Sequence, residues 1–222
     1  MCENRIEIVI AQPQHRDEIL NLLKNYFFPR VPMWAELNVD WTVIRNTIER
    51  IVDATLVDPV SLVAIDQSTP DHRIIGCRLS EIIDFTTPYE DGDYFEPPED
   101  KKARTVGRVL NQLMRGWKGE LERDGAQKVL EFVILCVEDS YGKRGLGRNL
   151  IERSLHIARD IGADCISVVA ASWRAQHIFQ KLQFEIKRTL EYAKVVDPDT
   201  GLPYVIPQDG SKVITWEVKK IR

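Results

Sequence analysis

The feature that most constrains this chain is an apolar segment that runs through a glycine-rich turn into an amphipathic one. Residues Val129 to Val137 are almost all apolar, which predicts a strand buried on both faces. From Leu146 to Ile161, apolar residues recur at spacings of three and four, which predicts a helix, and Gly162 is expected to end it. A strand, a glycine-rich turn and a helix therefore follow one another at 129–162.

The turn between them has the composition of a phosphate-binding site. The first backbone N–H groups of a helix lack partners and lie at the positive end of the helix dipole, where they attract anions. Glycines allow an anion to approach the backbone closely, and nearby cations add positive charge. The residues expected to line the site are Gly142, Lys143, Arg144, Gly145, Leu146, Gly147 and Arg148.

The spacing of the turn excludes two common phosphate-binding loops. Arg148 and Asn149 stand where a nucleotide-triphosphatase loop needs Lys-Ser or Lys-Thr. A dinucleotide fingerprint needs glycines in a one-three-six pattern near the first strand, whereas this turn lies two-thirds of the way along the chain. At this point an ordinary glycine-rich turn without a ligand is the alternative.

Composition indicates a single domain over residues 1–222. A chain of 222 residues with 44% hydrophobic content can bury a full core, and no Gly/Ser linker divides it. The net charge of -4, with no basic tail, argues against general nucleic-acid binding. No apolar run reaches membrane-spanning length, and the N-terminus lacks the apolar core of a signal peptide. We therefore expect a cytoplasmic monomer that binds neither nucleic acid nor membrane.

The cysteines and histidines do not have the spacing of a metal site. Cys2, Cys77, Cys136 and Cys165 contain no Cys-x-x-Cys pair, and two of them lie in apolar, strand-like runs, so we expect buried thiols rather than disulfides. The four histidines, at positions 15, 72, 156 and 177, are scattered, so no metal is expected.

Strands and helices are predicted along the rest of the chain. A first helix opens at 12–14 and ends at Pro29, and a second is capped by Asp40. Further helices are expected at 105–122 and 173–182. Strands are expected at 5–10, 61–66, 74–83, 163–170, 184–195 and 212–218, with turns at 68–71 and 197–201.

A long acidic loop interrupts this pattern between Asp84 and Lys102. It holds prolines at 88, 97 and 98 and seven acidic residues, so regular structure is not expected there. A loop of this kind could be a functional lid whose charge favours a cationic amine, or a solvated surface excursion. The sequence leaves both readings open.

Two motifs and the order of elements resemble the GCN5-related N-acetyltransferase (GNAT) superfamily. The turn is similar to its pyrophosphate motif, Gln/Arg-x-x-Gly-x-Gly/Ala, with Gly145 and Gly147 on the glycine positions and Gly142 departing at the first. Lys181-Leu182-Gln183-Phe184 resembles the Lys-Leu-Gly-Phe of the family. The resemblance covers the whole chain and implies an α/β fold whose mixed seven-stranded sheet, flanked by helices, is split around acetyl-CoA.

More narrowly, three segments resemble insect arylalkylamine N-acetyltransferases: Tyr26 to Met33, Val137 to Leu150 and Ala171 to Ala175. That resemblance implies transfer of acetyl from acetyl-CoA to amines such as dopamine, serotonin, tryptamine or octopamine, by direct attack in a ternary complex. It also implies that backbone groups of Leu135, Cys136 and Val137 bind the pantetheine arm, with the Val137 N–H near the thioester oxygen.

The expected catalytic residues depart from that family. An amine is protonated at neutral pH and must lose a proton before it attacks. The family glutamate for this task corresponds to Val31, so Glu36 is the nearest candidate base, although it could be an exposed loop residue. The family tyrosine corresponds to Phe179, which cannot donate a proton. Ser172 could protonate the leaving thiolate, or simply cap a helix.

Aromatic residues near the expected acceptor cleft are candidates for substrate binding. Trp34 and Trp173, with Trp41, could wall a site for an aromatic amine, and core packing would explain them equally well. Two further functions stay open: acetylation of another acceptor, such as a polyamine, hydrazine or peptide N-terminus, and binding of acetyl-CoA by a catalytically impaired relative.

Overall fold

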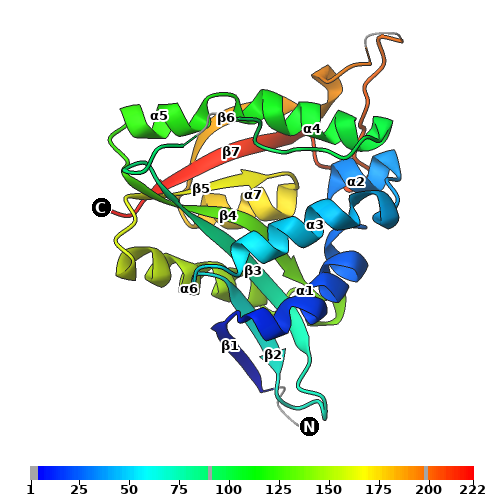
Figure 1. Ribbon diagram of the computed structural model, residues 1–222. Coiled ribbons are helices and arrows are strands. Elements are labelled where there is room, and N and C mark those ends of the chain that lie inside the picture. The colour runs from blue at the N-terminus through cyan, green and yellow to red at the C-terminus, as the bar shows by residue number, and fades with distance from the viewer. Residues whose placement is uncertain (1–4, 90–91, 198–199) are drawn as a thin grey trace.

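A seven-stranded mixed sheet forms the centre of the protein (Figure 1). The computed structural model describes residues 5–89, 92–197 and 200–222. The strands follow the order β1-β2-β3-β4-β5-β7-β6, and only β4 and β5 pair in parallel. Their bounds are β1 Ile6–Ile10, β2 Leu62–Asp66, β3 Ile74–Asp84, β4 Lys128–Val137, β5 Cys165–Ala170, β6 Glu185–Glu191 and β7 Val213–Lys220.

Helices cover both faces of the sheet. One face packs against α1 (Arg16–Leu22), α2 (Pro32–Leu37), α3 (Trp41–Thr55), α4 (Lys101–Met114) and α5 (Trp117–Arg123), and the larger core cluster lies there. The other face packs against α6 (Leu146–Asp160) and α7 (Trp173–Lys181). Short helical turns are η1 Pro13–His15, η2 Leu23–Phe27, η3 Asp139–Tyr141 and η4 Tyr192–Lys194.

The sheet opens between its two parallel strands. Residues Val129–Phe132 of β4 pair with Cys165–Val168 of β5, but β4 continues to Val137 without that partner. Beyond Phe132 the two strands separate, and their carboxyl ends border a gap. The sequence-based prediction of a split, seven-stranded mixed sheet is confirmed, as are the hairpin of β2 and β3 and the Asp40 cap of α3.

Three elements differ from the sequence-based expectation. The helix expected at 105–122 is two helices, because Gly116 adopts a left-handed conformation (φ 65°) between α4 and α5. Helix α2, which the sequence did not predict, has only six residues and is too short to show a helical period. The strand expected at 184–195 ends at Glu191, where η4 begins.

Some sequence-based expectations concern residues outside the described ranges. Cys2 and the N-terminal residues considered for a signal peptide belong to these, as do Pro198 and Asp199 of the turn expected at 197–201. The remaining three cysteines, Cys77, Cys136 and Cys165, are buried free thiols, as predicted.

Candidate active site

The glycine-rich turn connects the open end of β4 to the start of α6. Gly145 is the residue before the helix and has a φ of 80°, which favours glycine, while a Cβ there would meet no protein atom within 4 Å. The first backbone hydrogen bond of α6 runs from Asn149 N–H to Gly145 O (2.9 Å). The N–H groups of Leu146, Gly147 and Arg148 are therefore left at the open end of the helix. The sequence predicted an anion at this helix start, and its binding there stays a prediction.

Side chains of both signs surround the turn. Lys143 and Arg144 are exposed, and the Arg144 guanidinium lies 5.7 Å from the centre of the Tyr141 ring. Arg148 is partly committed elsewhere, because its Nε donates to Glu152 Oε1 (2.8 Å). Lys143 and Arg144 are thus the cations most available to an anion at the turn.

Two polar contacts anchor the base of the turn to the sheet. Arg73 on the hairpin binds both carboxylate oxygens of Glu138 (2.5 and 3.0 Å), and this hydrogen bonding lowers the pKa of Glu138. The Tyr141 hydroxyl donates to Asp66 at the end of β2 (2.5 Å). These contacts tie the turn to the sheet.

The end of β4 directs backbone groups into the gap. Val137 lies opposite Gly76 in the antiparallel ladder. Because the next residue, Glu138, donates its N–H to Ile75 O (2.8 Å), Val137 and Gly76 form a non-hydrogen-bonded pair. The N–H and C=O of Val137 therefore point away from β3, toward the side where β5 has separated. Leu135, two residues earlier, has the same orientation. Cys136 lies between them, and its backbone faces β3 instead.

An arginine that sequence reasoning did not select occupies part of this edge. Arg30, which follows η2, donates from Nη1 to Val137 O (3.2 Å) and pairs with Asp139. Its side chain is 39% exposed. Arg30 and Val137 are 107 residues apart, so no local pattern in the sequence could have connected them.

Two of the predicted site residues, Glu36 and Trp173, contact one segment, residues 208–211. Glu36 on α2 accepts a hydrogen bond from the Gln208 N–H (2.9 Å). Ser172 caps α7 and accepts from the Ala175 N–H (3.4 Å). Trp173 donates from Nε1 to Asp209 O (2.8 Å) and is 45% exposed. The structure thus brings the predicted base and one aromatic residue to the same loop, and Ser172 directly precedes Trp173 in the chain.

Of the other aromatic candidates, Trp34 lies in the core and Trp41 packs against it, partly buried. Trp34 is only 6% exposed, stacks on Phe28 (ring centres 5.3 Å apart) and meets the edge of Phe95 (5.8 Å). Trp41 meets the same Phe28 ring at 5.6 Å. Phe179 packs on Phe184, with 4.9 Å between their ring centres.

The acidic loop is attached to the body of the protein over its described part. Phe95 exchanges two hydrogen bonds with the Asn111 side chain, at 2.8 and 3.0 Å. Pro97 lies so close to Gly107 that a Cβ there would approach it to 2.7 Å. Residues 92–97 therefore pack on α4 rather than projecting freely into solvent.

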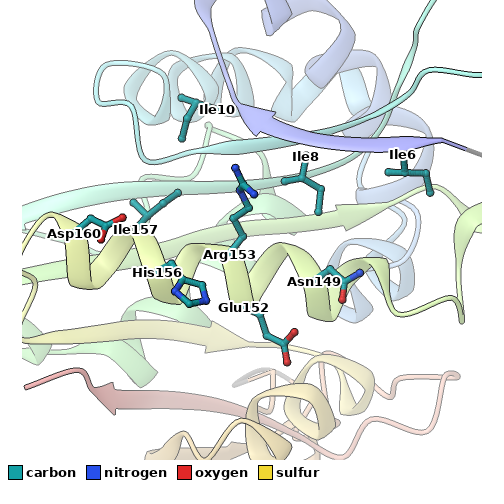
Figure 2. Close-up of a pocket in the computed structure, with 9 residues that line it drawn as sticks. All are labelled: Ile6, Ile8, Ile10, Asn149, Glu152, Arg153, His156, Ile157 and Asp160. Carbon is teal, nitrogen blue, oxygen red and sulfur yellow. The ribbon is translucent and has the colours of Figure 1, made fainter.

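A hollow of about 690 Å³ lies elsewhere, between β1 and α6 (Figure 2). Its β1 side presents Ile6, Ile8 and Ile10, and the Arg153 side chain of α6 points toward that strand. None of the predicted site residues lines it. This hollow is separate from the split and the turn.

Two kinds of feature are missing within residues 5–89, 92–197 and 200–222. No helix in these ranges has the length and apolar character needed to span a bilayer. No cluster of three or more His, Cys, Asp or Glu side chains there could hold a metal ion.

Comparison with known proteins finds similarity in structure but not in sequence. No protein-family model and no curated protein matches the chain. Arylalkylamine N-acetyltransferase 2 from Aedes aegypti superposes with a TM-score of 0.83 at 21% identity, covering 99% of this chain and 100% of that one.

Two further solved structures match nearly as well. Mosquito arylalkylamine N-acetyltransferase-like 5b has a TM-score of 0.77 at 18% identity and covers 97% of this chain and 100% of its own. The polyamine N-acetyltransferase of Drosophila melanogaster, which forms N-acetylagmatine, has a TM-score of 0.78 at 18% identity, with the same coverage. At such identities the likeness establishes the fold, which is that of the GNAT superfamily.

Proposed function

We propose that this chain is an acetyl-CoA-dependent N-acetyltransferase that acetylates the primary amine of an arylalkylamine. The observation that carries the proposal is the continuity of two features: the free N–H groups at the start of α6 and the inward-facing backbone of Leu135 and Val137. A diphosphate fits the first and an extended amide-containing arm fits the second. We further propose that residues 1–222 form one domain that acts as a monomer in the cytoplasm.

The residues present fit the coenzyme. The diphosphate would be held by the N–H groups of Leu146, Gly147 and Arg148, in the space that Gly145 leaves open. Arg144 stands two residues before the first residue of α6, so we assign it, rather than Gly142, the role of the first motif position. Acetyl-CoA, when bound, supplies the acetyl thioester.

The chain contributes proton transfer and oxyanion stabilisation. The Val137 N–H faces the gap and can donate to a developing oxyanion. Glu36 is proposed as the proton acceptor for the amine, directly or through water, and Ser172 as the proton donor to the departing thiolate. The loop at 208–211 supports this pairing of roles, because it contacts both Glu36 and Trp173. Holding both reactants side by side supplies much of the acceleration.

The aromatic side chains near the candidate catalytic residues favour an aromatic amine as the acetyl acceptor. Trp34, Phe28 and Phe95 form a cluster beside α2, and Trp173 presents an exposed ring near the candidate acid. The competing acceptor is a polyamine or agmatine, as in the Drosophila enzyme of the same fold. A third function, acetyl-CoA binding without turnover, is suggested by Val31 and Phe179 at the family's catalytic positions.

A thiol-release assay with acetyl-CoA separates these functions. Turnover with tryptamine, dopamine or serotonin would support the proposal, whereas turnover restricted to agmatine, spermidine or another non-arylalkylamine acceptor would replace the acceptor class. Heat stabilisation by acetyl-CoA with no turnover of any amine would indicate the binding-only function. Absence of both would refute acetyl-CoA as the ligand.

The pH profile of the rate tests Glu36. A proton acceptor produces a rate that rises through one ionisation, and Glu36→Gln removes that ionisation while keeping an oxygen for the Gln208 N–H. An unchanged profile in the variant would eliminate Glu36 from the reaction. Asp209→Asn, on the same segment, is the matched control and should leave the profile as in the parent.

A further inference from the structure

A buried arginine lies where β4 separates from β5. The Arg78 side chain on β3 is 1% exposed, and its guanidinium carbon is 3.6 Å from the centre of the Phe132 ring. Nη1 donates to two backbone oxygens, Leu79 O on β3 (3.1 Å) and Ile134 O on β4 (2.6 Å). One cation therefore joins the two strands.

The contact coincides with an irregularity in the ladder. Leu79 pairs with Ile134 and Ser80 pairs with Phe132, so Val133 is an extra residue on β4. A bulge of this kind bends the strand and increases its twist. Phe132 is also the last residue of β4 that pairs with β5. The bend, the end of the parallel pairing and the guanidinium thus occur at the same position.

Packing alone does not account for an arginine here. Its Nε and Nη2 are buried without a hydrogen-bond partner among the described residues, and burial lowers the pKa of the side chain to about 9. A buried charge that is only partly paired is costly, and an apolar side chain of similar length often serves stability as well or better. Besides the Phe132 ring and Leu79 O, the bond to Ile134 O is the contact that reaches the backbone of β4 beside the bulge.

We propose that Arg78 is a positioning residue that fixes the bend of β4 and so holds the backbone of Leu135 and Val137 in the gap. The proposal rests on the proposed function, since these groups matter as binders of the pantetheine arm. Leu135 follows Ile134 directly, so a shift of the bulge would rotate its N–H away from the arm. The turn at 142–147 is anchored separately, through Arg73 and Tyr141.

The test compares two ligands in two variants. Arg78→Met removes the donor but keeps the length, and calorimetry would measure its affinity for acetyl-CoA and for 3′-phospho-ADP, which keeps the diphosphate and lacks the arm. We expect acetyl-CoA to bind about tenfold more weakly and 3′-phospho-ADP to bind within about twofold of the parent. The melting temperature should not fall in proportion, and Arg78→Lys should restore part of the affinity.

Arg188 provides a matched control. It also donates to two backbone carbonyls, Leu113 O (3.0 Å) and Arg115 O (2.7 Å), and lies over an aromatic ring, Trp216. It is on β6, however, two strands beyond β5. Arg188→Met should lower stability and leave both affinities unchanged.

The other possible results of these binding measurements would also decide whether Arg78 has this role. Equal affinity of Arg78→Met and the parent for acetyl-CoA would overturn the proposal, as would equal weakening of both ligands. If Arg78→Met does not fold, Arg78→Lys carries the test, with about threefold weaker acetyl-CoA binding expected and unchanged 3′-phospho-ADP binding. A parent protein that binds neither ligand would instead refute the proposed function, and the role of Arg78 would fall with it.

Discussion

The hydroxyl of Tyr94 donates a hydrogen bond to the carboxylate of Glu131, with 2.9 Å between Tyr94 Oη and Glu131 Oε1. Tyr94 belongs to the acidic loop and Glu131 to β4, one residue before the last pairing with β5. Glu131 is 3% exposed, and its other oxygen has no hydrogen-bond partner among the described residues. The contact ties the loop to the strand that borders the gap.

The surroundings of Glu131 favour its protonated form. Burial raises the pKa of Glu131 to about 7, opposed by the nearby hydroxyl of Ser167 on β5, by the hydrogen bond from Tyr94 and by the charge of Arg78 on β3. Glu81, opposite it on β3, adds a negative charge that raises the pKa further. In the unfolded chain the same group titrates near 4.5.

Stability should therefore decrease as the pH rises from about 5 to about 7. The native state binds the Glu131 proton more tightly than the unfolded state, so this contribution is complete below the unfolded pKa and is lost as the pH rises through the native one. The shift corresponds to about 3 kcal/mol. Urea denaturation across this pH range measures it.

Glu131→Gln is the comparison for that measurement. The amide keeps an oxygen for Tyr94 and does not titrate, so the pH dependence of the free energy of unfolding should become flatter. Burial also raises the pKa of Glu81 and Glu217, and a smaller slope of the same sign should persist. Parallel pH profiles in parent and variant would show that Glu131 does not titrate in this range.

Gly145→Ala should weaken acetyl-CoA binding while costing little stability. An alanine at φ 80° is strained by about 1 kcal/mol, and its Cβ would point into the space proposed for the diphosphate. Gly116→Ala is the control, because Gly116 has a similar φ of 65° and equally open surroundings. Both should unfold at similarly lowered urea concentrations, and only Gly145→Ala should lose affinity, by about tenfold. Equal affinities would argue against a ligand at this turn.

Ser172→Ala should lower both stability and kcat. Loss of the helix cap costs about 1 kcal/mol, and loss of a proton donor slows the reaction by about 100-fold. Asp40→Ala removes a comparable cap, that of α3, and should affect stability alone. Steady-state rates of the two folded variants provide the measurement. If both variants kept the kcat of the parent, Ser172 would serve only as the cap of α7.

Trp34→Ala should raise the KM for tryptamine more than that for a short alkyl amine. The Trp34 ring stacks on Phe28, and its loss would also cost about 3 kcal/mol of packing free energy. Trp117→Ala removes an equally buried ring, that of the first residue of α5, and should change neither KM. Trp173→Ala, at an exposed ring, should show the same preference with a smaller loss of stability. If the KM for both amines rose by the same factor, these rings would not determine which amine is preferred.

The elements of the fold were largely predictable because their signals are local. The apolar run of β4, the helical period of α6 and the glycines between them are all read within about thirty residues. The wrong predictions concern places where an element ends although the apolar pattern of the sequence continues. Apolar residues recur on both sides of Gly116, so α4 and α5 looked like one helix.

The candidate site could be predicted only where a single segment builds it. The turn at 142–147 is such a segment, and its open helix end follows from its own residues. Glu36 and Ser172 were selected by comparison with motif positions, but the contacts of Glu36 and Trp173 with residues 208–211 join distant segments. Arg30 was missed, because its bond to Val137 spans 107 residues.

The sequence by itself determined which residues become strands, helices and the glycine-rich turn, because periodicity and turn chemistry act between near neighbours. Tertiary structure alone decided where the sheet opens and which side chains border the opening. The parallel pairing stops at Phe132, next to the extra residue Val133 of β4, and Arg78 of β3 donates to the following carbonyl, Ile134 O. A bulge of this kind depends on how two strands are paired, and no local pattern records that pairing.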